Sequence, residues 1–358
     1  MMSLTRLAER GLLPDFVVRM GIRRLLRARL DHERASQPAA ADVAASVFAD
    51  LMRALPIATE VDSANRQHYE FPADFFEQVL GPRRKYSCGL WERSDATLAD
   101  AEQAMLELTC ERAGIEDGMR LLDLGCGWGA FTLYAAERFP NCQIDAVSNS
   151  RVQKAVIERE TRRRGWNHVN VVTANVADFQ PRRTFDRIVS VEMFEHMRNH
   201  ERLLNRIATW LDPEGRLFVH LFVHDVYPYL FEAASDDDWM AREFFSGGLM
   251  PSRRLLHEFD ASLAVEKEWQ VSGAHYQRTS EAWLSRLDSR RPALQKQLTE
   301  EGVADASHAL NKWRIFFMAC AELFGWDEGR QWYVMHYLLA PVSTSRGGQG
   351  KKALVFET

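Results

Sequence analysis

From Met119 onward, short apolar runs alternate with longer segments whose apolar residues recur every three or four positions. The apolar runs are MRLLDLG, QIDAVSN, VNVVTAN, FDRIVSVE and GRLFVHLFVH. The periodic segments, such as TLYAAERF, VQKAVIERETRRRG and HERLLNRIATWL, have the spacing of amphipathic helices. Short buried strands that alternate with helices predict an α/β protein built on a doubly wound, parallel sheet.

This alternation stops after the fifth apolar run. DDDWMAREFFSGGLMP predicts a loop with a helix, and LAVEKEWQVSGAHY predicts a long strand. Residues 279–324 have helical periodicity, and QWYVMHYLLAP predicts a final strand. The first 60 or so residues also have a helical pattern, so helices are expected on both sides of the sheet in the sequence.

The composition is typical of a soluble globular protein. Of 358 residues, 46% are hydrophobic and 27% are charged, which allows a substantial core. The formal net charge of -5 argues against a general nucleic-acid binder, because such proteins are usually basic. None of the five cysteines belongs to a C-x-x-C pair, so neither a metal site nor a disulfide framework is predicted. No apolar run approaches the roughly 18 residues of a membrane span and no signal peptide is recognisable, so a cytoplasmic protein is expected.

A basic amphipathic helix is predicted near the N-terminus, where arginines alternate with apolar residues. The arginines are Arg19, Arg23, Arg24, Arg27 and Arg29, and the apolar residues are Val18, Ile22, Leu25, Leu26 and Leu30. One interpretation is peripheral contact with an anionic membrane surface. The alternative is a solvated face on a helix that packs against its own domain, and this alternative is favoured because it is commoner in soluble proteins.

A glycine turn, LLDLGCGWGAF, joins the first predicted strand to its helix. Gly125, Gly127 and Gly129 have the spacing G-x-G-x-G, which differs from the G-x-G-x-x-G of dinucleotide folds. Glycines let backbone amides approach a ligand at a helix N-terminus, and Asp123 can hold a cationic amino group. These features suit an amino acid attached to a nucleoside, although tight packing of strand against helix also requires glycine.

The ends of the next two strands are uncharged. Ser148 and Asn149 end the second strand and Gln153 follows, where a dinucleotide site would place Asp or Glu. Their side chains can bind the hydroxyl groups of a ribose. After the third strand, Asn175 and Val176 offer an amide and an apolar edge for adenine.

The fourth strand leads into VEMFEHM, in which Glu192, Glu195 and His196 interrupt an apolar run. Carboxylates rarely lie in such surroundings without a partner or a function. Helical spacing would aim both glutamates into one cavity at the ligand edge of the sheet, with His196 next to them. The alternatives are that His196 satisfies a helix end or a buried backbone group, and that a glutamate pairs with an arginine.

Several ordered motifs extend from about Gln67 to the end of the chain: HYEFPADFF, KYSCGLW, LLDLGCGWGAFTLY, SVEMFEHM, DDDWMAREFFSGGLMPS, HYQRTSEAWL, WRIFFMACAELFG and QWYVMHYL. Together they resemble S-adenosylmethionine-dependent methyltransferases of the cyclopropane-fatty-acid-synthase-like superfamily, and above all the coclaurine N-methyltransferases. The resemblance implies a seven-stranded, Rossmann-like methyltransferase sheet whose last strand is antiparallel. The expected organisation is a helical extension (1–66), a cofactor-closing segment (67–118), the cofactor-binding core (119–224), substrate-cap helices with the sixth strand (225–326), the final strand (327–342) and a tail (343–358).

The resemblance also implies residue roles. The catalytic residues are Glu192, Glu195 and His196. The cofactor-binding residues are Tyr86, Ser87, Asp123, Gly125, Gly127, Ser148, Asn149, Gln153, Asn175, Val176 and Val191. The substrate-binding residues are Glu70, Cys88, His220, Phe316 and Trp332. Asn175 stands where coclaurine-type enzymes tend to have Asp, and its amide carbonyl can still accept a hydrogen bond from adenine.

Two acceptors fit this resemblance, a small cyclic or aromatic amine and an unsaturated lipid chain. The cyclopropane synthases usually have a small residue at Glu192, and they hold a carbonate partly with a tyrosine where this chain has Ile315, Phe316 and Phe317. An extra carboxylate favours a cationic amine, and aromatic residues can hold a cation; they are Trp239, Phe244, Phe245, Phe324, Trp326 and Trp332. Cys88, Glu195 and His220 match positions around the carbonate and favour the lipid. A homodimer is expected, and a catalytically idle binding protein on this fold is the alternative from another class.

Overall fold

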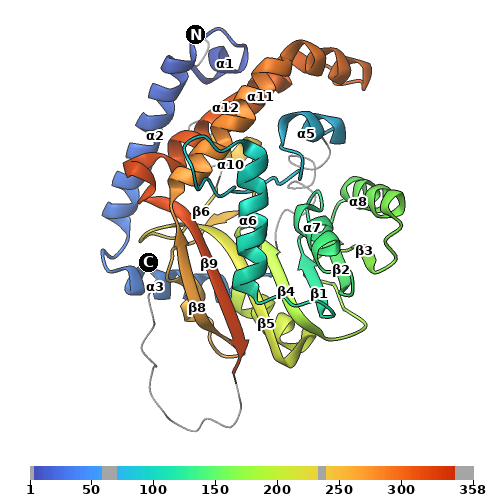
Figure 1. The fold of residues 1–358 in the computed structure, drawn as a ribbon. Coiled ribbons are helices and arrows are strands. Elements are labelled where there is room, and N and C mark those ends of the chain that lie inside the picture. Colours follow the sequence, from blue (N-terminus) through green and yellow to red (C-terminus); the bar gives the residue numbers. More distant parts are fainter. Residues whose placement is uncertain (1–3, 59–70, 233–238, 343–358) are drawn as a thin grey trace.

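The computed structural model describes residues 4–58, 71–232 and 239–342. A mixed sheet of seven strands has the spatial order β3-β2-β1-β4-β5-β9-β8 (Figure 1). The strands are β1 (Arg120–Leu124), β2 (Gln143–Ser148), β3 (Val169–Thr173), β4 (Phe185–Val191), β5 (Leu211–His224), β8 (Leu263–Val271) and β9 (Trp332–Pro341). A separate ribbon pairs β6 (Tyr229–Leu230) with β7 (Leu249–Met250).

The sheet has the predicted topology. Strands β1 to β5 pair in parallel, whereas the final strand β9 lies between β5 and β8 and is antiparallel to both. The doubly wound sheet and the antiparallel last strand are therefore confirmed. The strand order reverses between β1 and β4, and ligands bind in the crevice outside the carboxyl ends of the strands at such a reversal.

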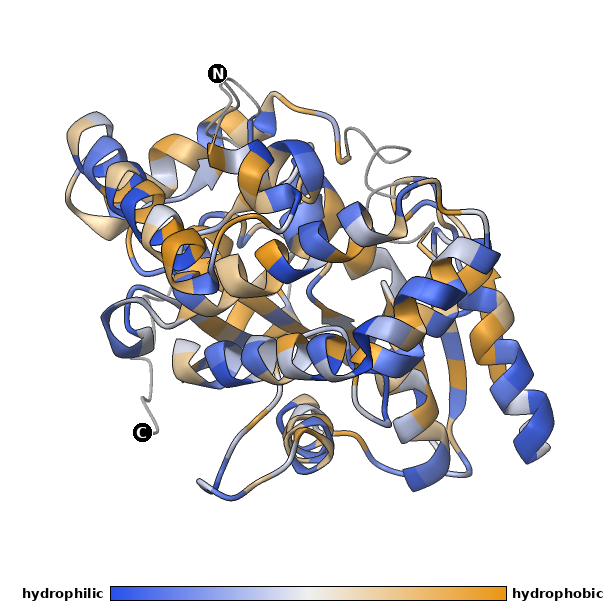
Figure 2. Cartoon of the chain, turned by 90° about the horizontal axis from the view of Figure 1, so that it is seen from above, coloured by the Kyte–Doolittle hydropathy of each residue, from blue (hydrophilic) through white to orange (hydrophobic). Residues whose placement is uncertain are grey.

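Helices cover the sheet and one of its ends. The helices are α1 (Leu4–Glu9), α2 (Asp15–Ser36), α3 (Ala41–Arg53), α5 (Ala73–Val79), α6 (Leu98–Ala113), α7 (Ala130–Arg138), α8 (Arg151–Arg164), α9 (His200–Trp210), α10 (Trp239–Glu243), α11 (Gly273–Glu300) and α12 (Ala306–Phe324). Figure 1 shows α6 across one face of the sheet, and α2, α11 and α12 grouped beyond the end where β9 begins. That end carries the carboxyl ends of the parallel strands, because His224 of β5 pairs with Trp332 of β9. Seen from above, these helices alternate hydrophilic and hydrophobic segments, as half-buried helices do (Figure 2).

The basic helix α2 packs against its own domain. Val18, Ile22 and Leu26 contact the core cluster that includes residues of α11 and α12. Arg19 forms ion pairs with Glu281 at 2.7 Å and Glu322 at 2.9 Å. The helix therefore packs against its own domain, which was the favoured interpretation of its basic pattern. None of the helices in the described ranges is both long and apolar enough to cross a membrane.

The predicted long strand LAVEKEWQVSGAHY is shorter in the structure, because β8 ends at Val271 and α11 begins at Gly273. The Ser272 side chain accepts a hydrogen bond from the Ala274 amide and so caps the helix. A Cβ atom at Gly273 would lie 2.2 Å from the carbonyl oxygen of Trp332. The glycine therefore allows the helix to start against β9, which ends the strand pattern.

Candidate active site

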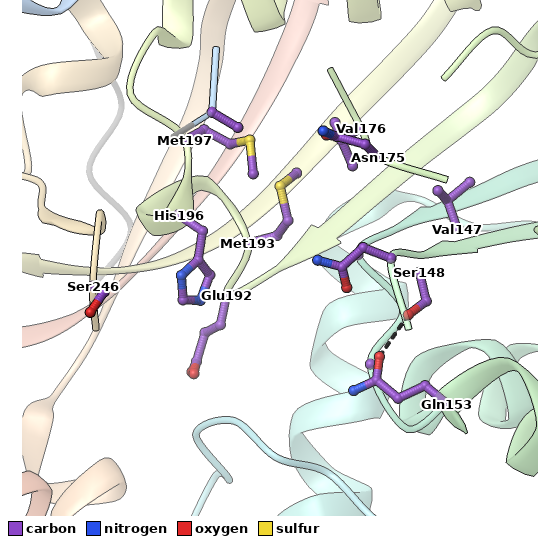
Figure 3. A pocket seen from close by; sticks show the side chains of 14 residues that line it. Val147, Ser148, Gln153, Asn175, Val176, Glu192, Met193, His196, Met197 and Ser246 are labelled. Carbon is purple, nitrogen blue, oxygen red and sulfur yellow. Dashed lines mark hydrogen bonds between the residues drawn. The ribbon is translucent and has the colours of Figure 1, made fainter. Parts of the chain in front are cut away.

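A cavity lies at the carboxyl ends of β1, β2 and β4, at the reversal of strand order. It is lined by Ala58, Gly125, Gly127, Val147, Ser148, Asn149, Gln153, Asn175, Val176, Glu192, Met193, His196, Met197 and Ser246. Figure 3 shows Ser148 and Gln153 toward one side, and Glu192 and His196 toward the other, with Met193 between them. The cavity therefore brings together most of the predicted cofactor residues and two of the three predicted catalytic residues.

The glycine turn connects β1 to α7, and its Gly125 and Gly127 line the cavity. Gly125 has φ of 89°, and a Cβ atom there would lie 2.7 Å from the Met193 side chain. Gly127 has φ of 51°, and a Cβ atom there would meet no heavy atom within 4 Å. Because Gly127 lines the cavity, that empty space belongs to the cavity and is available to a ligand.

The uncharged end of β2 is organised by hydrogen bonds. The Ser148 hydroxyl donates to Gln153 Oε1 at 2.7 Å, and the Ser150 amide donates to the Ser148 hydroxyl at 3.0 Å. The Gln153 Nε2 group is buried and has no hydrogen-bond partner among the described residues. A buried amide donor that faces a cavity is suited to a ligand oxygen, because leaving it unpaired is unfavourable.

Asn175 and Val176 line the cavity just after the end of β3. Asn175 Oδ1 accepts a hydrogen bond from the Ala177 amide at 2.9 Å, which fixes the side chain at the end of β3. One lone pair of that oxygen remains for a ligand. Val176 is buried and supplies the apolar neighbour expected beside a flat ring.

Asp123 does not line the cavity; it is a buried residue of β1, the strand that leads into the glycine turn. The Thr132 hydroxyl donates to Asp123 Oδ2 at 2.5 Å. Burial raises the pKa of Asp123 to about 7, although the bond from Thr132 opposes this. A carboxyl with such a raised folded-state pKa is favourable when protonated, and it costs stability as the pH rises toward 7.

We expect Asp123→Asn to stabilise the cofactor-free protein more at pH 8 than at pH 5. The unfolded Asp titrates near pH 3.9 and the folded one near 7, so wild-type stability falls between these values and the variant lacks this loss. The difference in the free energy of unfolding between the variant and the wild type can grow by at most about 1.4 kcal/mol per pH unit. Urea denaturation at pH 5 and pH 8 measures this difference. The same difference at both pH values would mean that Asp123 titrates like a surface carboxylate.

Glu192 is held in the cavity by donors from three parts of the chain. It has φ of 49°, and its amide donates to the His220 carbonyl at 2.9 Å. Glu192 Oε1 is 3.0 Å from the Cys88 amide and 3.2 Å from His220 Nε2. The Tyr276 hydroxyl donates to Glu192 Oε2 at 2.6 Å. A carboxylate with three donors is fixed in position and favoured in its charged form.

The buried Lys85 contributes a positive charge near Glu192. Its ammonium donates to the Ser87 hydroxyl at 2.5 Å and to the Cys88 carbonyl at 2.8 Å. Burial raises the pKa of Glu192 above its usual value, and the charge of Lys85 and the hydrogen bond from Tyr276 oppose part of this rise. Burial lowers the pKa of Lys85, and the charge of Glu192 opposes this. The two groups therefore favour each other's charged forms.

The short helix after β4 separates the two glutamates. Glu192 precedes the 3-10 helix Phe194–His196 in a left-handed conformation, so the expected helical turn does not join it to Glu195. Glu195 does not line the cavity, and neither of its buried carboxyl oxygens has a hydrogen-bond partner among the described residues. Burial, followed by the negative charge of Glu192, raises the pKa of Glu195 well above its usual value.

His196 reaches the cavity from the same short helix. Its ring stacks on Phe245 with 5.6 Å between the centroids and 4° between the planes. Burial lowers the pKa of His196 to about 4, although the charge of Glu192 opposes this. The imidazole is therefore neutral at pH 7 and can accept a proton.

Three other predicted cofactor residues, Tyr86, Ser87 and Val191, do not line the cavity. Tyr86 packs against Phe76 and Trp283, and Ser87 contacts Lys85. Val191 ends β4 opposite His220.

Two predicted substrate residues lie in the aromatic core instead. Phe316 stacks on Phe244 with 4.2 Å between the centroids, and the Trp332 indole donates to the Tyr229 hydroxyl. Neither lines the cavity. Glu70 lies outside the described residues.

The sequence interpretation missed Tyr276 and Lys85. Tyr276 belongs to the quoted motif HYQRTSEAWL, yet its sequence distance of 84 residues from Glu192 hid the contact. Lys85 is the first residue of the quoted motif KYSCGLW. A lysine in an otherwise apolar and aromatic stretch was the available signal, because buried lysines require an acidic partner.

The chain is similar to known proteins over most of its length. Residues 58–332 match the family described as mycolic acid cyclopropane synthetase. The chain is 38% identical to an (S)-coclaurine N-methyltransferase of Thalictrum flavum subsp. glaucum over 341 residues, which are 94% of each chain. It is similar to the crystal structure of a coclaurine N-methyltransferase bound to N-methylheliamine and SAH, with a TM-score of 0.88 and 36% identity over 94% of this chain and 98% of that one. A cyclopropane synthase from Mycobacterium tuberculosis gives a TM-score of 0.67 and 26% identity, over 78% and 97% of the two chains.

Proposed function

The chain belongs to the mycolic acid cyclopropane synthetase family, and on this premise we propose that it methylates the nitrogen of a small cyclic or aromatic amine, such as a tetrahydroisoquinoline. It is an S-adenosylmethionine-dependent methyltransferase. The amine is proposed because the matched relatives include coclaurine N-methyltransferases that cover nearly the whole chain. Peripheral membrane contact and a homodimer stay predictions.

The residues of the cavity fit S-adenosylmethionine. The empty space at Gly127 suits the amino-acid part, and the unpaired Gln153 amide suits a ribose hydroxyl. Asn175 and Val176 suit the adenine ring. When bound, this group supplies a methyl carried on a positively charged sulfur, which the protein must present to a nucleophile in line.

The observation that most supports an amine is the fixed carboxylate of Glu192. Its oxygens receive hydrogen bonds from Cys88, His220 and Tyr276, yet it lines the cavity. A negative charge fixed at the acceptor side attracts an ammonium ion and stabilises the cationic product of methylation. The lipid chain of a cyclopropane substrate offers no such charge.

His196 provides the base. An aliphatic amine is mostly protonated at neutral pH and must lose that proton before its nitrogen can attack a methyl group. His196 lines the cavity beside Glu192, and its ring nitrogen takes the proton. Burial in the empty cavity lowers the pKa of His196 to about 4, and the charge of Glu192 favours the protonated ring that results. Glu192 then holds the amine, while His196 accepts the proton.

The lipid alternative has weaker support from the same residues. Cys88 and His220 match positions that surround a carbonate in cyclopropane synthases, but here their donors bind Glu192 Oε1. Phe316, which stands where a carbonate-binding tyrosine is expected, stacks in the aromatic core. Glu192 thus uses the donors that a carbonate would need.

A cofactor with a fully deuterated methyl group separates the two reactions. Methyl transfer to nitrogen removes no hydrogen from the methyl group, so the product should keep all three deuterium atoms. Cyclopropane formation passes through a carbocation, and a base must remove one hydrogen from the transferred carbon. We expect full retention on a tetrahydroisoquinoline, measured by mass spectrometry, and no stimulation by added bicarbonate.

The control is an unsaturated phospholipid assayed under the same conditions. A lipid product that lacks one deuterium and depends on bicarbonate would replace the amine proposal with the lipid alternative. If neither panel yields product while the cofactor binds, the idle binding protein is the better description.

A further inference from the structure

Two buried histidines lie side by side on neighbouring strands behind Glu192. His220 of β5 is the direct cross-strand partner of His336 of β9, and Trp269 of β8 is the partner of His336 on its other side. Directly opposite residues project from the same face of a sheet, so these side chains form a row. Both histidines are 0% exposed. Helix α6 covers this face and brings Arg112 over the Trp269 ring, 5.1 Å from its centroid.

The row forms a continuous chain of hydrogen bonds that ends at the cavity. Arg112 Nη1 is 2.8 Å from His336 Nδ1, and His336 Nε2 is 2.9 Å from His220 Nδ1. His220 Nε2 is 3.2 Å from Glu192 Oε1. Every ring nitrogen in the chain therefore has a partner, as a buried polar network requires.

The arginine fixes the direction of every bond in this chain. A guanidinium only donates, so His336 Nδ1 must accept and the proton of that ring must be on Nε2. His336 then donates to His220 Nδ1, which leaves the His220 proton on Nε2, directed at Glu192. Burial and the charge of Arg112 keep the pKa of each histidine well below its usual value, so both rings are neutral. Burial lowers the pKa of Arg112 only to about 10, so it stays charged at pH 7.

We propose that Arg112 and His336 are positioning residues. Acting through His220, they keep the Glu192 carboxylate oriented and ionised, so that it can bind the amine substrate. This inference rests on the proposed function. Because these hydrogen bonds have a fixed direction, a proton cannot leave the cavity along them. His336 Nδ1 would have to pass the proton to Arg112, which can only donate. The proton of the amine therefore does not leave through β5 and β9, and in the proposed function it is taken by His196, which lines the cavity.

The tautomers are tested without any amine. In protein labelled with 15N in its histidine rings, long-range proton–nitrogen spectra show which nitrogen carries the proton. We expect both His220 and His336 to carry one proton, on Nε2, at pH 7, with signals assigned from the His336→Gln spectrum. In Arg112→Met, His336 should begin to populate the form protonated on Nδ1. A proton on Nδ1 of either ring in the wild type, or no change in Arg112→Met, would overturn the proposal.

The activity test uses two substitutions at one position. In His336→Gln, the amide can accept from Arg112 with its oxygen and donate to His220 with its nitrogen. In His336→Leu the ring volume is replaced by an apolar group that fits the core but cannot relay a hydrogen bond. We expect the leucine variant to lose about 10- to 100-fold in kcat, as losses of partners behind a reactive group do, and the glutamine variant to retain most of it.

Cofactor binding and thermal melting are measured for both variants, because a merely structural role would lower stability without separating their kcat values. The same kcat in His336→Leu and His336→Gln, whether reduced or close to that of the wild type, would contradict the proposal. If the wild type methylates no amine, the proposed function fails, and the nitrogen spectra still decide whether Arg112 sets the tautomers.

Discussion

Replacing His196 with alanine should lower turnover about 100- to 10,000-fold, the usual cost of losing a general base, while the cofactor still binds. His196 lines the acceptor side of the cavity and is neutral at pH 7, because burial lowers its pKa to about 4. Without it, none of the described residues that line the cavity has an imidazole to take the proton of the ammonium form of the substrate. Initial rates with a tetrahydroisoquinoline and calorimetry with S-adenosylhomocysteine measure the two quantities separately.

Two further results should follow if His196 acts as the base. Added imidazole should restore part of the rate of His196→Ala, and raising the pH should narrow the gap to the wild type, because more amine is then neutral in solution. His257→Ala is the matched control, since His257 pairs with Glu268 at 2.7 Å and does not line the cavity. Wild-type rates in His196→Ala, or an equal loss of cofactor binding, would contradict the assignment.

Gly127→Leu should abolish detectable cofactor binding, a loss of about 100-fold or more, while the protein stays folded. A Cβ atom at Gly127 meets no protein atom within 4 Å, so a leucine side chain would extend into the cavity instead of the core. A 100-fold loss of affinity corresponds to a loss of about 3 kcal/mol in binding free energy. Calorimetry with S-adenosylhomocysteine measures the binding, and circular dichroism measures the fold.

Gly165→Leu provides a control for backbone strain. Gly165 ends α8 with φ of 70°, and a Cβ atom there also meets no heavy atom within 4 Å. A leucine in either left-handed position costs on the order of 1–3 kcal/mol of strain, but Gly165 does not line the cavity. Normal binding by Gly165→Leu with lost binding by Gly127→Leu would isolate the effect of the side chain in the cavity. Normal binding by both variants would place the cofactor elsewhere.

The alternation of strands and helices, the glycine turn and the uncharged end of β2 were predictable because their signals are local. Buried strands and amphipathic helices leave apolar periodicities over a few residues, and parallel strands bring their carboxyl ends to one edge. Ser148, Gln153, Asn175 and Val176 therefore converge in one cavity as soon as the sheet forms.

The resemblance to a family added what periodicity does not contain, namely the antiparallel final strand and the catalytic role proposed for the stretch at Glu192. Helical spacing failed at this stretch, because Glu192 adopts φ of 49° and its amide bonds to the His220 carbonyl. A local pattern cannot anticipate such a conformation, since the surrounding structure has to hold it in place.

The sequence alone thus indicated which edge of the sheet carries the cavity and which residue types meet there. Only the tertiary structure decided how these groups are charged and connected. Tyr276 lies 84 residues from Glu192, and Arg112 lies 224 residues from His336, yet each pair is in hydrogen-bond contact. Register between distant strands and burial from all sides set these contacts and the pKa values that follow from them. Neither is encoded within any short stretch of the chain.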